Sequence, residues 1–339
     1  MEAYFERELQ KNVETINRLN GEHCLTFPVL ADVHIHPERP EFMLRYEHTI
    51  ENMKEVNRQC RIDAQFYLGD LLLVTGALPG DYWTVERTDR ALEQLRTDLL
   101  SCNENSFFVA GNHDGPGAGP ARPEDWYRQM IDPEKVCGVE DQGYFYVDFP
   151  EKKVRAVCLM DTRQVAGEEY EGYLPEQLRW LADTALQIPQ DYRVLIFTHV
   201  TLWGERRLRS QDNSEDLIGI FRAFQNREKY EGNVVCADFS HRNDGKICAL
   251  FGGHDHVQWA GHACGVPFLQ IETPSNMIHH AQNSKGWHLP EGFVPVQRKM
   301  YEETEVLWDT VVFDVEQELI HVIRFGSGED VTYELGEGK

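Results

Sequence analysis

Apolar residues in the first third of the chain alternate between short continuous runs and helical spacing. The runs at 27–31, 64–68 and 106–110 are bounded by polar residues and predict strands. Between them, residues 42–57 and 84–100 repeat their apolar positions with the period of amphipathic helices. This order predicts a β-α-β alternation at the start of an α/β fold.

The remainder of the chain predicts mixed strands. The expected elements are strands at 143–149, 154–160, 194–197, 247–251 and 267–271, a helix at 175–186, and a C-terminal hairpin at about 306–326. The stretch from about 202 to 245 shows no clear pattern. Early β-α-β units followed by mixed strands predict two packed sheets with helices on their outer faces.

No repeat or low-complexity linker divides the chain, so we expect a single domain over residues 1–339. An amphipathic helix at 1–22 precedes it as a packed N-terminal addition. At 339 residues, with 41% hydrophobic and 27% charged residues, the chain has the composition of a soluble globular protein.

Composition narrows the partners and the location. The net charge of −24 disfavours long nucleic acids as partners. No apolar run is long enough for a membrane span, and residues 1–7 lack the pattern of a signal peptide, so we expect a cytoplasmic protein without a membrane partner. None of the eight cysteines forms a C-x-x-C pair, which favours reduced thiols over a zinc–thiolate site or a disulfide framework.

Polar residues that can bind metals follow five of the predicted strands. They are Asp32 and His34, Asp70 after Gly69, Asn112 and His113 after Gly111, His199, and His254 and His256. In an extended segment, residues two apart project from the same face, so Asp32 and His34 can ligate one ion together. Because open α/β sheets bind ligands at the carboxyl ends of their strands, the set predicts a metal site there.

Each fragment alone also fits an ordinary turn or a solvated loop. His36 shares the parity of His34 and competes with it as a ligand, although the following Pro37 favours a loop edge. The loop at 115–120 fits a leaving-group pocket and a plain Gly/Pro connection about equally.

The five segments together resemble the calcineurin-like metallophosphoesterases, whose pattern is D-x-H, G-D, G-N-H-[DE], a single His, and G-H-x-H. The resemblance spans about residues 27–275, which we expect to be the motif-bearing core. It implies a four-layer α/β/β/α sandwich of two mixed β-sheets flanked by helices.

The resemblance also implies a role for each residue. One ion would be held by Asp32, His34 and His256, and a second by Asn112, His199 and His254, with Asp70 bridging both. His113 would be the histidine that binds no metal and acts as the catalytic acid, with Asp114 as the partner that orients it. The donors suit two divalent or trivalent ions, Mn²⁺ first, with Fe or Zn²⁺ as alternatives.

The implied activity is phosphate-ester hydrolysis by a metal-bridging hydroxide. A phosphodiester or a small nucleotide-like molecule is the first substrate hypothesis. A phosphomonoesterase or protein phosphatase is the alternative within the same chemistry. A non-catalytic scaffold of the same fold, used for protein binding, is the alternative of another class. The sequence does not indicate the oligomeric state.

Substrate-binding residues are not identified by any motif. Arg206 and Arg207 form a cationic cluster soon after His199 and could receive a phosphate or carboxylate, although a solvated surface is the alternative. His279 follows the last predicted strand before the hairpin and could line the mouth of the site.

Overall fold

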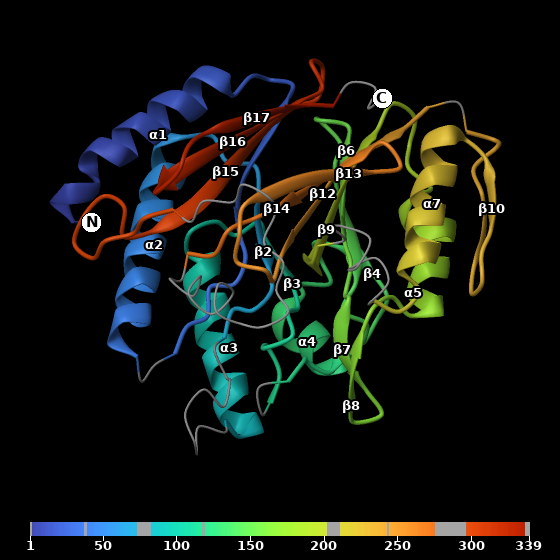
Figure 1. The fold of residues 1–339 in the computed structure, drawn as a ribbon, viewed down its shortest axis with the longest axis horizontal. Coiled ribbons are helices and arrows are strands. Elements are labelled where there is room, and N and C mark those ends of the chain that lie inside the picture. The colour runs from blue at the N-terminus through green and yellow to red at the C-terminus, as the bar shows by residue number, and fades with distance from the viewer. Residues whose placement is uncertain are drawn as a thin grey trace.

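The computed structural model describes residues 2–36, 39–72, 83–116, 119–201, 211–242, 244–274 and 296–335. Two large sheets lie face to face, and helices cover their outer sides (Figure 1). The predicted α/β fold, with two mixed sheets flanked by helices, is confirmed.

The first sheet has the strand order β17-β16-β15-β1-β2-β3. Its strands are β1 (Cys24–Leu30), β2 (Gln65–Leu68), β3 (Ser106–Val109), β15 (Leu307–Asp314), β16 (Leu319–Gly326) and β17 (Val331–Glu334). The three N-terminal strands pair in parallel, whereas β15 joins β1 antiparallel and begins the C-terminal meander. The parallel strands therefore end at one edge of this sheet.

The second large sheet has the order β13-β14-β12-β9-β6-β5-β4. Its strands are β4 (Cys137–Gly138), β5 (Phe145–Phe149), β6 (Val154–Cys158), β9 (Arg193–Val200), β12 (Lys246–Gly253), β13 (Trp259–Ala263) and β14 (Val266–Gln270). Strands β6, β9, β12 and β14 are parallel. Two hairpins stand apart, one of β7 (Thr162–Val165) and β8 (Glu168–Glu171), the other of β10 (Lys229–Glu231) and β11 (Cys236–Asp238).

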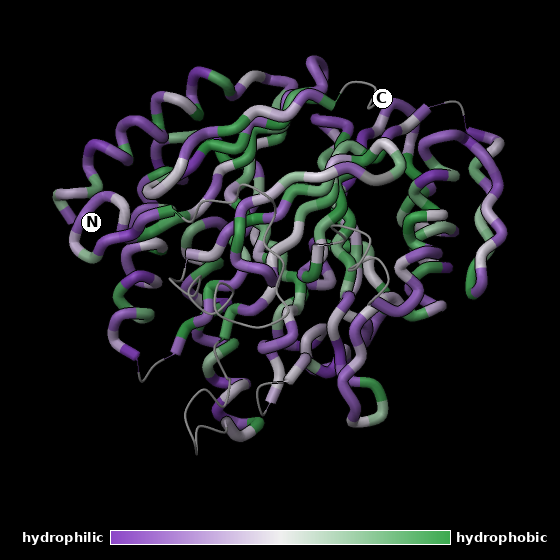
Figure 2. Tube along the Cα trace, in the orientation of Figure 1, coloured by the Kyte–Doolittle hydropathy of each residue, from purple (hydrophilic) through white to green (hydrophobic). Residues whose placement is uncertain are grey.

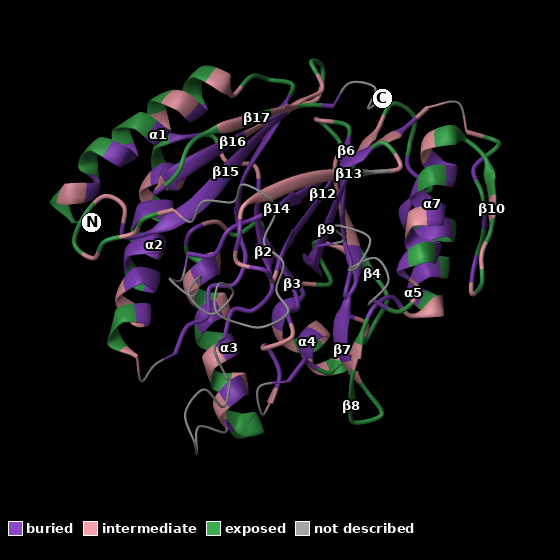
Figure 3. Cartoon of the chain, viewed as in Figure 1, coloured by how far each residue is buried: buried purple, intermediate pink, exposed green. Residues whose placement is uncertain are grey.

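The helices form the two outer layers. They are α1 (Glu6–Leu19) after a short 3-10 turn at Ala3–Phe5, α2 (Pro40–Gln59), α3 (Val85–Leu100), α4 (Pro123–Met130), α5 (Pro175–Trp180) and α7 (Ser214–Asn226). Helix α5 continues as one turn of π-helix, Leu181–Ala185. Figure 3 shows the helices exposed on one side only, as expected for amphipathic helices on a sheet.

Aromatic side chains join the two sheets between their facing sides. The ring of Phe66 on β2 stacks on Phe197 of β9 with centroids 3.9 Å apart, and Phe27 on β1 contacts Phe251 of β12 edge-on at 5.8 Å. All four rings are fully buried. Such aromatic pairs contribute about 0.5–1.5 kcal/mol each beyond their buried area. The hydrophobic strands of both sheets run through this interior (Figure 2).

Most predicted elements are present, with boundaries shifted by a few residues, and several others were not predicted. The unpredicted elements are α4, α7, the β7–β8 and β10–β11 hairpins, β4, β13 and β17. The stretch 202–245 therefore contains a full helix and a hairpin within its described residues. Among the described helices, none is long and apolar enough to cross a membrane.

Candidate metal centre

Asp32 and His34 lie in the loop that follows β1, and both have left-handed backbones. Their φ angles are 57° and 51°. The segment is therefore not extended, whereas the prediction that both side chains share one face assumed an extended segment. The side chains of Asp32 and His34 converge because the loop turns twice. The predicted proximity is therefore present, but its cause is the loop and not an extended strand. Left-handed non-glycine residues cost about 1–3 kcal/mol each and cluster at functional sites.

The loop after β1 is held in this shape by the loop after β2. The backbone N–H of Asp32 donates to the carbonyl of Gly69 at 3.0 Å, and that of His34 donates to the carbonyl of Asp70 at 2.9 Å. The parallel pairing of β1 and β2 thus continues beyond both strands and brings their polar ends together.

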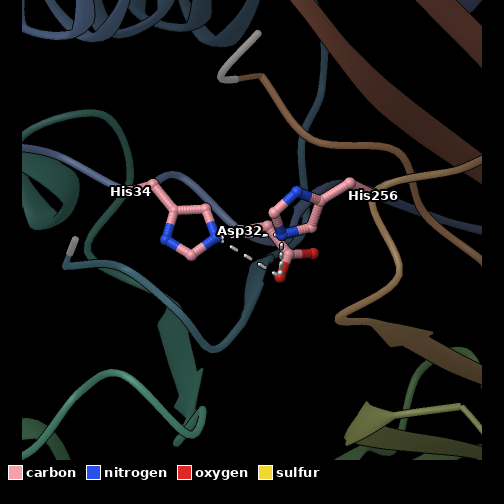
Figure 4. A group of neighbouring side chains, drawn as sticks. All are labelled: Asp32, His34 and His256. Atoms are coloured by element: carbon pink, nitrogen blue, oxygen red, sulfur yellow. Dashed lines mark hydrogen bonds and ion pairs between the residues drawn. The ribbon is translucent and has the colours of Figure 1, made fainter. Parts of the chain in front are cut away.

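The first ligand group consists of Asp32, His34 and His256, whose ligand atoms all lie within 4.8 Å of one another. Asp32 Oδ1 is 3.3 Å from His256 Nε2, and the Nε2 atoms of His34 and His256 are 2.9 Å apart (Figure 4). His34 Nδ1 lies 3.3 Å from the carbonyl oxygen of Leu72. A carbonyl only accepts, so Nδ1 carries the proton and Nε2 keeps its lone pair for a ligand.

The second ligand group consists of Asp70, His199 and His254, again within 4.8 Å. Asn112 completes it, because its Oδ1 lies 2.9 Å from His199 Nε2 and 2.8 Å from His254 Nδ1. His199 Nδ1 is 2.7 Å from the carbonyl oxygen of Leu68, which directs Nε2 toward the group. His199 is the seventh residue of β9, inside the strand and not after it.

Asp70 lies between the two groups. Its Oδ1 is 3.4 Å from His199 Nε2, and its Oδ2 is 3.8 Å from His34 Nε2. The residue is buried, and its backbone is left-handed with a φ of 51°. One carboxylate oxygen therefore faces each group.

Charge is distributed unevenly among the histidines of the two groups. Burial and the neighbouring His256 lower the pKa of His34 to about 3. Burial also opposes charge on His199 and His256, but their pKa values are raised because the carboxylates of Asp70 and Asp32 outweigh it. Burial likewise opposes the charge on Asp70, whose pKa is nevertheless lowered by the adjacent histidines. Carboxylates are thus paired with protons that a cation would replace.

The donor set fits divalent transition metals. It combines carboxylate and amide oxygens with imidazole nitrogens and contains no thiolate, which suits Mn²⁺, Fe or Zn²⁺. The close approach of imidazole nitrogens to one another, at 2.9 Å and 3.2 Å, places several lone pairs around each of two points. The residues present therefore fit two ions.

The structure corrects the expected role of Asp114. Its Oδ2 accepts the backbone N–H groups of Asp70 and Gly111 at 2.9 and 2.8 Å, and its Oδ1 accepts those of Leu71 and Leu72. Burial and the charge of Asp70 raise its pKa to about 6. The carboxylate therefore holds the turn at Asp70 and is not bonded to the ring of His113.

His113 lies at the edge of the centre and belongs to neither ligand group. Its Nε2 is 3.8 Å from Asp70 Oδ2, and its ring centroid is 5.6 Å from that of His34. The side chain is 24% exposed, whereas those of His34 and His199 are buried. Its backbone N–H donates to Asp70 Oδ1, and Nδ1 has no hydrogen-bond partner among the described residues.

Two glycines permit the close packing of these loops. A Cβ on Gly111 would lie 2.1 Å from the backbone nitrogen of Asp70, and one on Gly253 would lie 2.5 Å from Asp32 Oδ2. Real Cβ atoms do not approach other heavy atoms so closely. The glycines before Asn112 and His254 are thus required by the proximity of two metal-binding loops.

Of the weaker candidates, only His36 lies within the described residues. His36 is buried beside the ring of Trp83, with centroids 6.0 Å apart, and belongs to neither group. Arg206, Arg207 and His279 fall outside the described residues, so their roles stay predictions.

Sequence reasoning missed two buried residues that support the ligands. Asp161 Oδ2 accepts from the Thr198 hydroxyl and the Val200 N–H, both at 2.7 Å, on either side of His199. The hydroxyl of Thr273 donates to the Asp32 carbonyl at 2.5 Å. Both residues closely follow strands of the second sheet, β6 and β14, so the strand-end pattern that identified the ligands also applies to them.

Two facing mixed sheets with Asp, Asn and His converging at their strand ends define a protein of the metallophosphoesterase class. The calcineurin-like phosphoesterase family matches residues 25–258, and the chain belongs to this family. A search of curated proteins found no match.

Several solved structures resemble the chain. A conserved uncharacterized protein of Streptococcus pneumoniae, described as a predicted phosphoesterase, has 12% identity and a TM-score of 0.35, with 91% of this chain and 97% of that chain covered. The NAD nucleotidase of Haemophilus influenzae has 10% identity and a TM-score of 0.40, with coverage of 92% and 49%. GAP50 of Plasmodium, described as the anchor in the inner membrane complex, has 11% identity and a TM-score of 0.47, with coverage of 93% and 90%. This chain thus spans about half the length of the nucleotidase.

Proposed function

We propose that the chain is a phosphoesterase with a binuclear metal centre. Asp32, His34 and His256 would hold one ion, Asn112, His199 and His254 would hold the other, and Asp70 would be shared by both. The observation that carries this assignment is the position of Asp70, with one carboxylate oxygen toward each group at 3.4 and 3.8 Å. Mn²⁺ is the expected metal, with Fe and Zn²⁺ as alternatives.

When bound, two ions would supply an acidified water and neutralise charge on the phosphoryl oxygens. The protein's own contribution is to position them. The carbonyls of Leu68 and Leu72 fix the rings of His199 and His34, and Asp114 fixes the turn that carries Asp70.

His113 is proposed to donate a proton to the oxygen of the leaving group. Its ring is partly exposed, whereas the ligands His34 and His199 are buried, and its Nε2 faces Asp70 from outside both ligand groups. This position puts a proton donor at the rim, where a leaving group departs toward solvent. A positioned acid of this kind contributes about 10²–10⁴-fold to the rate.

The proposed substrate is a phosphodiester or a small nucleotide-like molecule in the cytoplasm. The net charge of −24 disfavours long nucleic acids, while two ions would attract a small anion locally. A phosphomonoester is the alternative substrate. Protein phosphatase activity and a purely scaffolding role are the further alternatives, and metal content with turnover separates the scaffold from an enzyme.

The test begins with the metals bound by the purified protein. The protein is then assayed with Mn²⁺ on matched pairs of phosphodiesters and phosphomonoesters that share one leaving group. Two ions per chain and faster cleavage of the diesters support the proposal. Faster cleavage of the monoesters overturns the substrate order, and bound metal without turnover of any ester, in the native protein and with each metal, supports the scaffold.

A further inference from the structure

Thr273 contacts the metal centre from outside the segment that defines the family. It follows β14, is completely buried, and donates its hydroxyl hydrogen to the backbone carbonyl of Asp32 at 2.5 Å. The family match ends at residue 258. A residue beyond the shared motifs thus contacts a proposed metal ligand of the chain.

The contact matters because Asp32 has an unfavourable backbone. Its φ of 57° is a left-handed conformation that is costly for a residue other than glycine, so hydrogen bonds to its backbone are needed to hold it. The neighbouring groups of Asp32 are also fixed, since its N–H donates to Gly69 and its Oδ2 accepts the N–H of His254. The Thr273 hydroxyl adds a bond at the carbonyl of the same residue.

Thr273 is itself held by a buried arginine. The guanidinium of Arg298 donates to the carbonyls of Thr273 and Pro274 and to Glu272 Oε1 at 3.2 Å. The side chains of Arg298 and Glu272 are at most 1% exposed. Three bonds from one planar group therefore hold the backbone carbonyls of Thr273 and Pro274 and the side chain of Glu272.

Arg298 is anchored through Glu272 to the C-terminal strands. Glu272 Oε2 is 3.8 Å from Arg324 of β16, and Arg324 forms a two-pronged ion pair with Asp309 of β15 at 2.6 and 3.2 Å. Two arginines and two carboxylates balance in charge, as burial of such groups requires. The chain of contacts runs from the C-terminal hairpin to Asp32.

We infer that Thr273 is a positioning residue for the first metal site and that the buried Glu272–Arg298 pair holds it in place. This inference rests on the proposed binuclear centre. Loss of the hydroxyl frees the turn at Asp32 and loosens its carboxylate beside His34 and His256. The second group takes no ligand from Asp32, so its ion is affected less.

Thr273→Val tests the inference because it removes the hydroxyl and keeps the shape. Thr273→Ser keeps the hydroxyl, and Thr310→Val is the matched control, since Thr310 on β15 is buried and its hydroxyl has no described partner. The full-length proteins are freed of metal and titrated with Mn²⁺ by calorimetry. Thermal unfolding of the metal-free proteins is measured alongside.

We expect Thr273→Val to bind one of the two ions about 10–100-fold more weakly, the range seen when a residue supporting a ligand is removed. The other ion should lose less affinity, and the serine variant and the Thr310→Val control should retain native affinity for both ions. Native affinity for both ions in Thr273→Val overturns this inference but not the proposed centre. Equally weak binding in the serine variant, which keeps the hydroxyl, does the same. The serine variant is the one to test if the valine protein does not fold. A native protein that takes up no Mn²⁺, and no Fe or Zn²⁺ in the same titration, overturns the proposed centre as well.

Discussion

The carboxylate of Asp114 is hydrogen-bonded to the backbone N–H of Asp70, with Oδ2 2.9 Å from the nitrogen. The same oxygen accepts the N–H of Gly111, and the other oxygen accepts those of Leu71 and Leu72. One buried side chain thus binds the loops after β2 and β3 to each other. Asp70, which lies between the two ligand groups, depends for its position on the bond from its N–H to Asp114.

Asp114→Asn should impair metal binding and stability together. An amide has only one acceptor oxygen, and its NH₂ group would face backbone N–H donors. Each buried donor left unsatisfied costs about 1–3 kcal/mol. We expect a lower free energy of unfolding in urea and less bound metal by elemental analysis. Asp183→Asn, on an exposed position after α5, is the control and should change neither.

If Asp114 acted through His113 instead, Asp114→Asn and His113→Ala would have the same effect. The hydrogen bonds predict a difference, because only the Asp114 variant should lose metal. Full metal occupancy in Asp114→Asn with reduced turnover would contradict the role that the structure gives this residue.

His113→Ala should lower kcat by about 10²-fold or more and leave both ions bound. The ring lies outside both ligand groups, and its Nε2 is 3.8 Å from the nearest Asp70 oxygen. The loss should be largest for alkoxide leaving groups and much smaller for a nitrophenolate, which departs without a proton. A loss of the same size for both leaving groups would exclude His113 as the acid.

Asp70→Ala should empty the centre more completely than loss of any other ligand. Asp70 alone faces both groups, and its neighbours His199 and His34 would then lose the carboxylate between them. We expect fewer than one tightly bound ion per chain by elemental analysis. Two ions still bound would refute the bridging position.

The grouping of the ligand side chains could be predicted from the sequence because most of them directly follow a strand. Asp32, Asp70 and Asn112 follow three parallel neighbours of one sheet, and parallel strands end at a common edge. The left-handed turns at Asp32 and His34 could not be predicted, because they depend on bonds to the loop after β2. The spacing of Asp32 and His34, two residues apart, therefore correctly predicted that their side chains converge. The extended backbone assumed for them was wrong.

The missed features differ in kind. The buried positions Leu217, Ile220, Phe221 and Phe224 of α7 have helical spacing, so that helix was within reach of the sequence pattern. Thr273 was not, because its partner Asp32 is 241 residues away. The contact between Thr273 and Asp32 depends on the pairing of β14 with β12. No local sequence pattern specifies that pairing.

Glu318, in the turn between β15 and β16, joins the two sheets. Its Oε2 lies 2.7 Å from Lys246 Nζ of β12, and its Oε1 lies 3.2 Å from Arg193 Nε of β9. Partial burial opposes the charged carboxylate, but the two cations outweigh it and lower its pKa below 4.5. Ionised Glu318 thus stabilises the folded state.

Glu318→Gln should therefore destabilise the protein at neutral pH by about 0.5–1 kcal/mol, as for other partly exposed ion pairs. Because the folded pKa lies below the ordinary value, this stabilisation is complete above pH 4.5 and is lost as the pH falls through the folded pKa. The unfolding free energies of the native protein and the variant, measured in urea, should converge in acid. Glu93→Gln on the exposed face of α3 is the control and should show no such convergence. A difference that persists unchanged at the lowest pH would mean that Glu318 stabilises the sheets by packing and not by its charge.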